Sequence, residues 1–309
     1  MKTIATTKTE KVENDNNPRL WRSIERAIMK RHGLLNRVRA VGLLAVMVLV
    51  PVGQAAQAQG KQDLLPPTVF QAAGLTADSI QSTVDAYRAA LDPAKHNNGN
   101  NPGPLPLTSG HREINWDGGN PAITATTPPV TPFTTFLNTR GSQFTTPGIG
   151  LSQVALSGLA GLFNNLTYED IFSVFSPSRL FTPVGSNVTE ALFFVPGTNG
   201  GTPATVSGFG AVFTDVDQPD GSGPSKKRGN RGASTLIEYF GADGKVLFSS
   251  FVPASPGDAS LSFFGIVFDE PLIARVRITT GDTAPGPDDD ENQDIVVMDD
   301  FLYGEPQAR

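Results

Sequence analysis

The chain has 309 residues, with 24 Lys and Arg, 30 Asp and Glu and no Cys, and 39% of its residues are hydrophobic against 17% charged. This balance is typical of a globular protein and argues against a disordered one. The absence of cysteine excludes disulfide frameworks, thiolate zinc sites, iron–sulfur clusters and cysteine nucleophiles.

An apolar stretch at residues 40–52 predicts export. Several arginines and lysines precede it, and Ala56-Gln57-Ala58 follows it. A basic region, a short apolar core and a small-x-small site together indicate a secretory signal peptide over residues 1–58. The stretch is shorter than the roughly 20 residues that a membrane-spanning helix needs, so we expect cleavage rather than anchoring. Met29 begins an ordinary signal peptide of its own and is an alternative start.

Removal of the leader would leave an acidic protein. Residues 59–309 contain 14 Lys and Arg and 26 Asp and Glu, a formal charge of −12. Such a charge argues against nucleic acid and anionic lipid as partners, and it is compatible with divalent cations or with simple solubility outside the cell. We therefore expect a secreted or periplasmic bacterial protein with no membrane span after the leader.

Residues 77–91 are predicted to form the one N-terminal helix, with Thr76 as N-cap and Pro93 ending the run. Residues 92–110 are rich in Pro, Gly and Asn and predict a linker. Residues 59–110 are thus expected to form a segment before a main domain at 111–309. The apolar residues at helical spacing are Ile80, Val84, Tyr87 and Leu91.

Short runs of β-branched and aromatic residues alternate with turn-forming clusters after His111, a cadence that predicts an antiparallel β-sandwich. Asp243-Gly244 predicts a tight hairpin between two of these runs. The alternation in 273–278 predicts a half-buried strand with two arginines on its polar face, and 294–303, apolar on both faces, predicts a central strand. Residues 151–185 show no clear pattern. The predicted strands are 112–117, 122–127, 190–195, 205–217, 234–240, 245–252, 261–268, 273–279 and 294–303.

Asp299 and Asp300 are the first candidate metal ligands, because two carboxylates on an apolar strand are costly to ionise without a partner. By strict alternation, Asp299 shares a face with Phe301 and Asp300 with Leu302. Pairing of these carboxylates with an arginine or with backbone amides, their exposure at a strand end, and Ca²⁺ binding are the three alternatives that the sequence leaves open.

Asp215 and Asp217 form a second candidate Ca²⁺ site, because the period of two places both carboxylates on one side of a strand end. A solvated turn is the alternative. The acidic run Asp288–Glu291 and the basic run Lys226–Arg231 are interpreted as surface loops, and the lead-in to the basic run does not match a phosphate-binding loop.

Catalytic signals are sparse. Only His96 and His111 remain after residue 58, which excludes a three-histidine zinc site. Paired carboxylates for glycoside cleavage stay open, because their separation cannot be read from the sequence. Glycan binding would need exposed aromatic side chains.

The residues proposed for ligand binding cluster mainly around the single tryptophan after the leader. Trp116, Glu113 and Asn115 offer an aromatic face and polar groups close together, and Tyr239 is a further exposed-aromatic candidate. A tryptophan in the core at a strand end is the alternative interpretation of Trp116.

Four segments, 112–118, 192–198, 208–217 and 297–306, resemble a group of secreted bacterial proteins of unassigned function, with coverage from about Leu75 to Gln307. The carboxyl half also resembles the jelly-roll ectodomains of exported proteins that end in a Pro-Glu-Pro sorting tail. Gly304-Glu305-Pro306-Gln307 is followed by no apolar helix or basic cluster, so that type of anchoring is not expected.

The resemblance implies a jelly-roll-like sandwich similar to galactose-binding or carbohydrate-binding modules, some of which hold a structural calcium where the first and last strands meet. Mapped by position, Asp117 and either Asp299 or Asp300 would be the ligands. The leading hypothesis is an exported, non-catalytic protein that binds a glycan or other surface component or has a structural role, with Ca²⁺ as a candidate stabiliser. The alternative is a polysaccharide-active enzyme with paired carboxylates. A cleft with converging carboxylates would favour the enzyme, and a shallow face with exposed Trp116 or Tyr239 would favour the binding protein.

Overall fold

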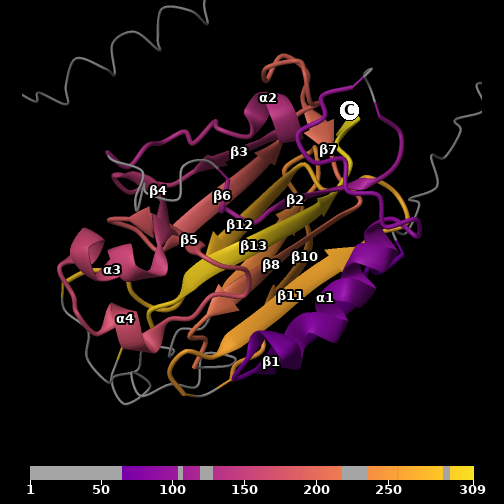
Figure 1. Cartoon of the computed structure of the whole chain (residues 1–309). Coiled ribbons are helices and arrows are strands. Elements are labelled where there is room, and N and C mark those ends of the chain that lie inside the picture. The colour runs from indigo at the N-terminus through magenta and orange to yellow at the C-terminus, as the bar shows by residue number, and fades with distance from the viewer. Residues whose placement is uncertain (1–64, 104–106, 119–127, 218–234, 256, 288–292) are drawn as a thin grey trace, which may run out of the picture. The chain divides into compact units, whose positions relative to one another are not determined.

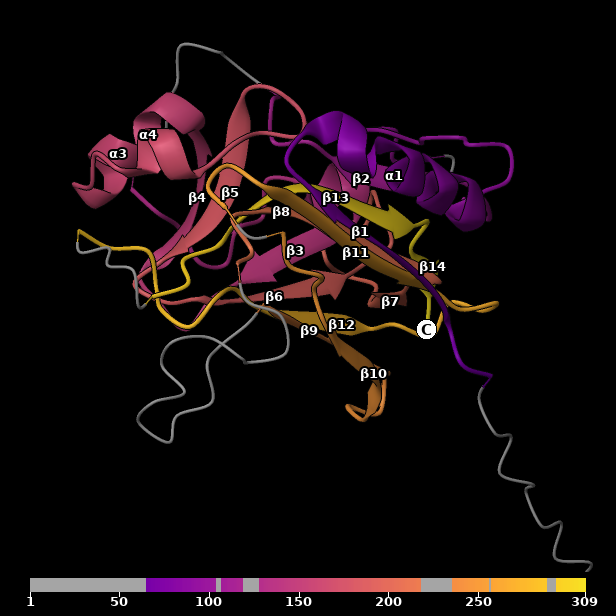
Figure 2. The same ribbon diagram turned by 90° about the horizontal axis from the view of Figure 1, so that it is seen from below.

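The computed structural model describes residues 65–103, 107–118, 128–217, 235–255, 257–287 and 293–309. Two antiparallel sheets lie face to face, which confirms the mainly β, antiparallel sandwich (Figures 1 and 2). The jelly-roll connectivity stays a prediction. The predicted signal peptide at 1–58, the strand at 122–127, the basic loop and the acidic loop lie outside the described residues.

The larger, seven-stranded sheet has the order β1-β11-β8-β13-β5-β4, and β2 also pairs with β13. Strand β13 is central and buried along its whole length, as its two apolar faces predict. The strands are β1 (Thr68–Gly74), β2 (His111–Ile114), β4 (Gly150–Ala155), β5 (Arg179–Val184), β8 (Gly208–Thr214), β11 (Leu261–Val267) and β13 (Val297–Gly304).

The smaller, five-stranded sheet has the order β10-β9-β12-β6-β3. Its strands alternate between buried and partly exposed residues, so one face is in the core and the other faces outward. In β12, Val276 and Ile278 are buried and Arg275 and Arg277 lie on the outer face, as predicted. The strands are β3 (Ser142–Thr145), β6 (Val188–Phe193), β9 (Leu236–Phe240), β10 (Val246–Phe251) and β12 (Arg275–Thr279), and a separate pair is formed by β7 (Ala204–Thr205) and β14 (Gln307–Ala308).

The main core fills the space between the two sheets. It joins Phe209 and Phe301 of the larger sheet to Val276 and Tyr239 of the smaller one. Two further clusters lie on the other face of the larger sheet, under the helices (Figure 2). The helices are α1 (Ala77–Leu91), α2 (Leu137–Arg140), α3 (Leu156–Phe163) and α4 (Tyr168–Ile171). No helix in the described part of the chain is both long enough and apolar enough to span a bilayer.

Helix α1 is confirmed, and it packs Ile80, Val84 and Tyr87 onto the larger sheet. Strand β1, which sequence patterning did not predict, precedes α1 and pairs with β11 over its full length. The described residues before His111 therefore add a strand and a helix to the larger sheet, which sequence patterning had assigned to 111–309 alone.

The hairpin between β9 and β10 is also confirmed. The backbone N–H of Gly244 donates to the carbonyl of Gly241 at 3.0 Å, and Gly244 has a φ of 78°. Only the glycine of Asp243-Gly244 has a positive φ, and the register shifts by one residue between Val246 and Phe248. The turn is thus a four-residue turn with a bulge rather than a two-residue loop.

Two paired glycines explain how closely α1 approaches the sheet. Gly210 of β8 lies opposite Gly265 of β11, and the Tyr87 ring covers both. The Tyr87 hydroxyl donates to the carbonyl of Ile266 at 3.2 Å. A Cβ at Gly265 would lie 2.8 Å from Cε2 of Tyr87, closer than packed carbon atoms allow.

Gly265→Ala is therefore expected to lower the free energy of unfolding by about 1–3 kcal/mol, because the tyrosine ring must shift. Gly161→Ala in α3 is the matched control, since a Cβ there meets no atom within 4 Å. Thermal unfolding by calorimetry measures both. Equal melting temperatures for Gly265→Ala and the control would contradict this view of the α1 interface.

Candidate functional site

Strand β13 changes partners at Asp299 and Asp300. Before these residues Met298 pairs with Phe181 of β5, and after them Phe301 pairs with Ile114 of β2. On its other edge, the register with β8 shifts between Met298 and Phe301, so two residues of β13 lie opposite one residue of β8. This is a β-bulge, and it frees the two aspartates from regular pairing.

The bulge corrects the predicted faces of β13. Met298 lies in the core between the sheets, and beyond the bulge so do Phe301 and Tyr303, whereas Leu302 lies under α1. Strict alternation would have placed Met298 and Phe301 on opposite faces. Because the extra residue reverses the alternation, both aspartate side chains reach the same segment, Phe175–Arg179.

Three predicted metal ligands, Asp117, Asp299 and Asp300, do come together at this segment. Asp299 Oδ2 accepts hydrogen bonds from the backbone N–H of Phe175 at 2.6 Å and Ser176 at 3.3 Å. Asp117 Oδ1 accepts from the backbone N–H groups of Ser178 and, at 2.8 Å, of Arg179. These contacts bind the segment to β13 and to the end of β2.

The Ser176 hydroxyl connects two of the carboxyl groups. Its Oγ lies 2.6 Å from Asp300 Oδ1 and 3.2 Å from Asp117 Oδ2. One hydroxyl proton cannot serve both acceptors. When Asp300 is protonated, its O–H can donate to Ser176 Oγ, and the hydroxyl then donates to Asp117.

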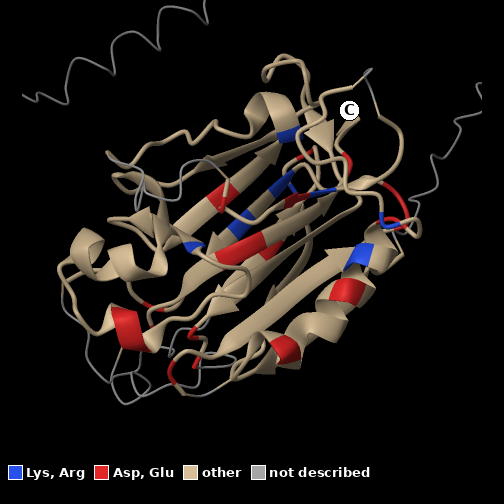
Figure 3. Cartoon of the chain, in the orientation of Figure 1, with Lys and Arg blue, Asp and Glu red and all other residues tan. Residues whose placement is uncertain are grey.

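A polar hollow of about 480 Å³ lies beside this segment. Its lining residues come from α1, the loop after α1, β2 and the residue that follows it, the end of α2, the Phe175–Pro177 segment and β13. Figure 3 shows acidic and basic positions next to each other along α1. Two of the predicted ligand-binding residues, Glu113 and Asn115, line the hollow, and so does Asp300. The polar and charged residues that line the hollow are Gln81, Arg88, Asn97, Glu113, Asn115, Arg140, Ser176 and Asp300.

Glu113 is held as an anion by two neighbours. Arg88 Nε and Nη2 donate to its two oxygens at 3.0 Å each, and His111 Nε2 lies 2.8 Å from Oε1. Burial alone would raise the pKa of Glu113, but the hydrogen bonds from His111 and Arg88 lower it to about 2. Both carboxylate oxygens are thus engaged.

Asp300 behaves in the opposite way. Burial raises its pKa to about 6, and the nearby Glu113 charge acts in the same direction, against the hydrogen bond from Ser176. Burial also raises the pKa of Asp299 well above its usual value, and the Asp300 charge adds to this. The hollow therefore contains one carboxyl group that stays ionised and one that titrates near neutrality.

The expectation of an exposed aromatic face at Trp116 or Tyr239 is wrong, because both side chains are fully buried. Trp116 stacks on Phe181 with ring centroids 3.8 Å apart and an interplanar angle of 2°. Its Nε1 donates to the carbonyl of Asp299 at 2.8 Å. The core interpretation of Trp116 is the correct one, and the ring fixes β2 beside the bulge of β13.

Asp215 and Asp217 follow β8 directly. Asp215 is buried with a φ of 69°, so the chain leaves extended geometry there, and Asp217 Oδ1 accepts from the backbone N–H of Gly257 at 2.9 Å. Within the described residues, no group of three or more His, Cys, Asp or Glu side chains is placed to hold a metal ion. Calcium binding stays a prediction.

Sequence reasoning missed the basic residues of the hollow. Arg140 is the last residue of the unpredicted helix α2. Its Nε donates to Asn100 Oδ1 at 2.7 Å, and its Nη1 donates to the Glu113 carbonyl. Its side chain forms no ion pair with a carboxylate among the described residues. Arg88 is a polar residue of α1 that lies next to the buried face of the helix. Its spacing of four residues from the buried Val84 is the only sequence signal that places it near the sheet.

Comparison with protein-family models, with curated proteins and with solved structures finds no match for this chain.

Proposed function

We propose that this chain is an exported, non-catalytic β-sandwich protein that binds a hydroxyl-rich ligand such as a glycan in the hollow between α1 and β2. The observation that carries the proposal is the mixture of polar groups that line that hollow: a carboxyl group of Asp300, carboxamides of Gln81 and Asn115, and a guanidinium of Arg140. Sugar hydroxyls both donate and accept hydrogen bonds, so a site for them needs both kinds of partner.

Other parts of this proposal rest on the sequence. The leader at 1–58 and the charge of −12 after it support a secreted or periplasmic location and a partner other than nucleic acid. Calcium as a stabiliser belongs to the proposal as a prediction.

A second candidate is cleavage of a polysaccharide by paired carboxylates. Glu113 and Asp300 line the same hollow with pKa values of about 2 and about 6, a separation that suits a base and an acid. The engagement of both Glu113 oxygens by Arg88 and His111 argues against a free nucleophile or base. Binding is therefore favoured over cleavage.

A glycan array of short oligosaccharides probed with the purified protein tests the proposal. Gln81→Ala and Asp300→Asn are each expected to weaken binding about tenfold, the effect of losing one good hydrogen bond. Wild-type binding should also change between pH 5 and pH 7, as Asp300 loses its proton. Gln71→Ala, an exposed glutamine on β1, is the matched control.

The outcomes separate the hypotheses. An empty array for the wild type would remove the binding proposal and favour a purely structural role. Release of reducing ends from a bound glycan by the wild type, lost in Asp300→Asn, would establish the enzyme instead.

A further inference from the structure

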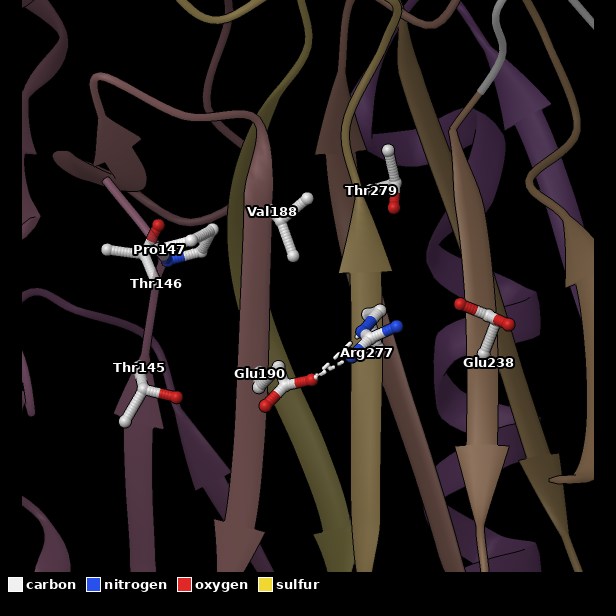
Figure 4. A pocket seen from close by; sticks show the side chains of 8 residues that line it. All are labelled: Thr145, Thr146, Pro147, Val188, Glu190, Glu238, Arg277 and Thr279. Atoms are coloured by element: carbon white, nitrogen blue, oxygen red, sulfur yellow. Dashed lines mark hydrogen bonds and ion pairs between the residues drawn. The ribbon is translucent and has the colours of Figure 1, made fainter. Parts of the chain in front are cut away.

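A second hollow lies on the opposite side of the sandwich, on the outer face of the five-stranded sheet. It has a volume of about 540 Å³ and is lined by residues of β3, β6, β12 and β9 (Figure 4). The α1 site lies on the outer face of the other sheet, so the two hollows share no lining residue.

The pairing register aligns polar side chains across this face. Thr145 lies opposite Glu190, Glu190 opposite Arg277, and Arg277 opposite Glu238. Figure 4 shows these four side chains in one row across four strands. Neighbouring strands are about 4.8 Å apart, so the row offers one polar group per strand at a spacing close to the length of a sugar ring.

The row contains two glutamates and one arginine, and Arg275, two residues from Arg277 along β12, adds a second positive charge on the same face. Glu190 Oε1 accepts from Arg275 at 2.6 Å and lies 2.7 Å from Arg277 Nη2, so one carboxylate holds both arginines. Glu238 has no ion-pair partner among the described residues, and its oxygens face the hollow (Figure 4). With Arg275 counted, two arginines and two glutamates cancel on this part of the outer face, so neither a polyanion nor a polycation is attracted.

An exposed aromatic ring lies beside the row. Phe251 of β10 is 43% exposed and pairs with Leu236, which lies opposite Thr279. Ser249 of β10 pairs with Glu238, so its side chain is on the same outer face as the row. Phe251 follows Ser249 by two residues and is therefore on that face too, about 7 Å from Ser249 along the strand. An open aromatic face next to polar groups is the arrangement on which the apolar face of a sugar ring packs.

We propose that this groove binds a neutral polysaccharide whose chain runs across the strands, with hydroxyls on Thr145 and Glu238 and a ring against Phe251. The inference goes beyond the proposed function, because it assigns a separate site on a different sheet and a long, uncharged ligand. If both sites bind, the protein joins two carbohydrate chains.

Affinity electrophoresis in gels containing mixed-linkage β-glucan, xyloglucan or galactomannan tests this groove. At least one of these polymers should retard the wild type, and Phe251→Ala and Glu238→Ala should each weaken the retardation about tenfold. Glu270→Ala, an exposed glutamate outside the groove, is the matched control. Unchanged melting temperatures for the variants exclude unfolding as the cause of a loss.

Three results would overturn the proposal: no retardation by any of the three polymers, equal retardation of the wild type and both groove variants, or stronger retardation by polygalacturonate than by the neutral polymers. Asp300→Asn separates this groove from the α1 site. If Asp300→Asn abolishes retardation while Glu238→Ala does not, the polymer binds at the α1 site and the groove proposal fails.

Discussion

Arg112→Met is expected to lower the free energy of unfolding by about 3–5 kcal/mol, because it leaves the buried carboxylate of Glu305 without its guanidinium partner. Arg112 is fully buried, and its Nε and Nη2 donate to the two oxygens of Glu305 at 2.6 and 2.7 Å. Its Nη1 donates to the carbonyls of Gly99, Asn101 and Thr139 at 2.8, 2.9 and 3.1 Å. One guanidinium thus joins β2, the end of β13 and the loop after α1.

Urea denaturation followed by tryptophan fluorescence measures this effect. The double variant Arg112→Met/Glu305→Met should regain part of the loss, since it no longer buries an unpaired charge. Lys245→Met is the control, because the Lys245–Asp243 pair is exposed and should contribute nothing measurable. A loss for Arg112→Met no larger than that of the control would show that the buried pair does not hold the fold.

Asp294→Asn is expected to stabilise the protein in alkaline solution. Asp294 is 2% exposed, and its carboxyl group forms no ion pair among the described residues. Burial raises its pKa to about 8, and the charges of Asp217 and Asp282 add to this. The folded protein therefore keeps a proton that the unfolded chain loses near pH 4.

The sign of the effect follows from this difference. Below about pH 4 the Asp294 carboxyl is protonated in both the folded and the unfolded protein, so it does not lower the free energy of unfolding. As pH rises from 4 toward 8, only the unfolded chain releases this proton, and the free energy of unfolding falls. Asn carries no such charge, so the variant should exceed the wild type by about 2–5 kcal/mol at pH 9 and by little at pH 4. Urea denaturation at both pH values, with chelator present throughout, measures this difference in the free energy of unfolding. Asp258→Asn, which removes an exposed carboxylate, is the control. Equal differences from wild type at both pH values would contradict the prediction.

The sandwich could be predicted from the sequence because its signals are local. The spacing of Ile80, Val84 and Tyr87 specifies α1, and the alternation in β12 specifies a half-buried strand. Strand β1 was missed because its Ala-Ala-Gly end has little β propensity, and its pairing with β11, about 190 residues later, stabilises it instead.

The candidate site could be predicted only in part. Glu113, Asn115 and Asp300 were selected from their chemistry, and Asp117 only from the resemblance. The bulge that turns Asp299 and Asp300 to one side depends on the register between β13 and β8. The sequence could not distinguish a buried Trp116 from an exposed one, because a tryptophan at a strand end is compatible with a core position and with a surface position. Phe251, the exposed aromatic ring, has no local feature that separates it from the buried phenylalanines.

The central place of β13 has a consequence for the order of assembly. Its partners β2, β5 and β8 all precede it in the chain, and β5 and β2 bind it on the same edge. Until this strand emerges from the ribosome, the two halves of the larger sheet have no common neighbour, and stable closure must wait for contacts of long sequence separation. A nascent chain of this design therefore cannot complete the larger sheet before β13 has been synthesised.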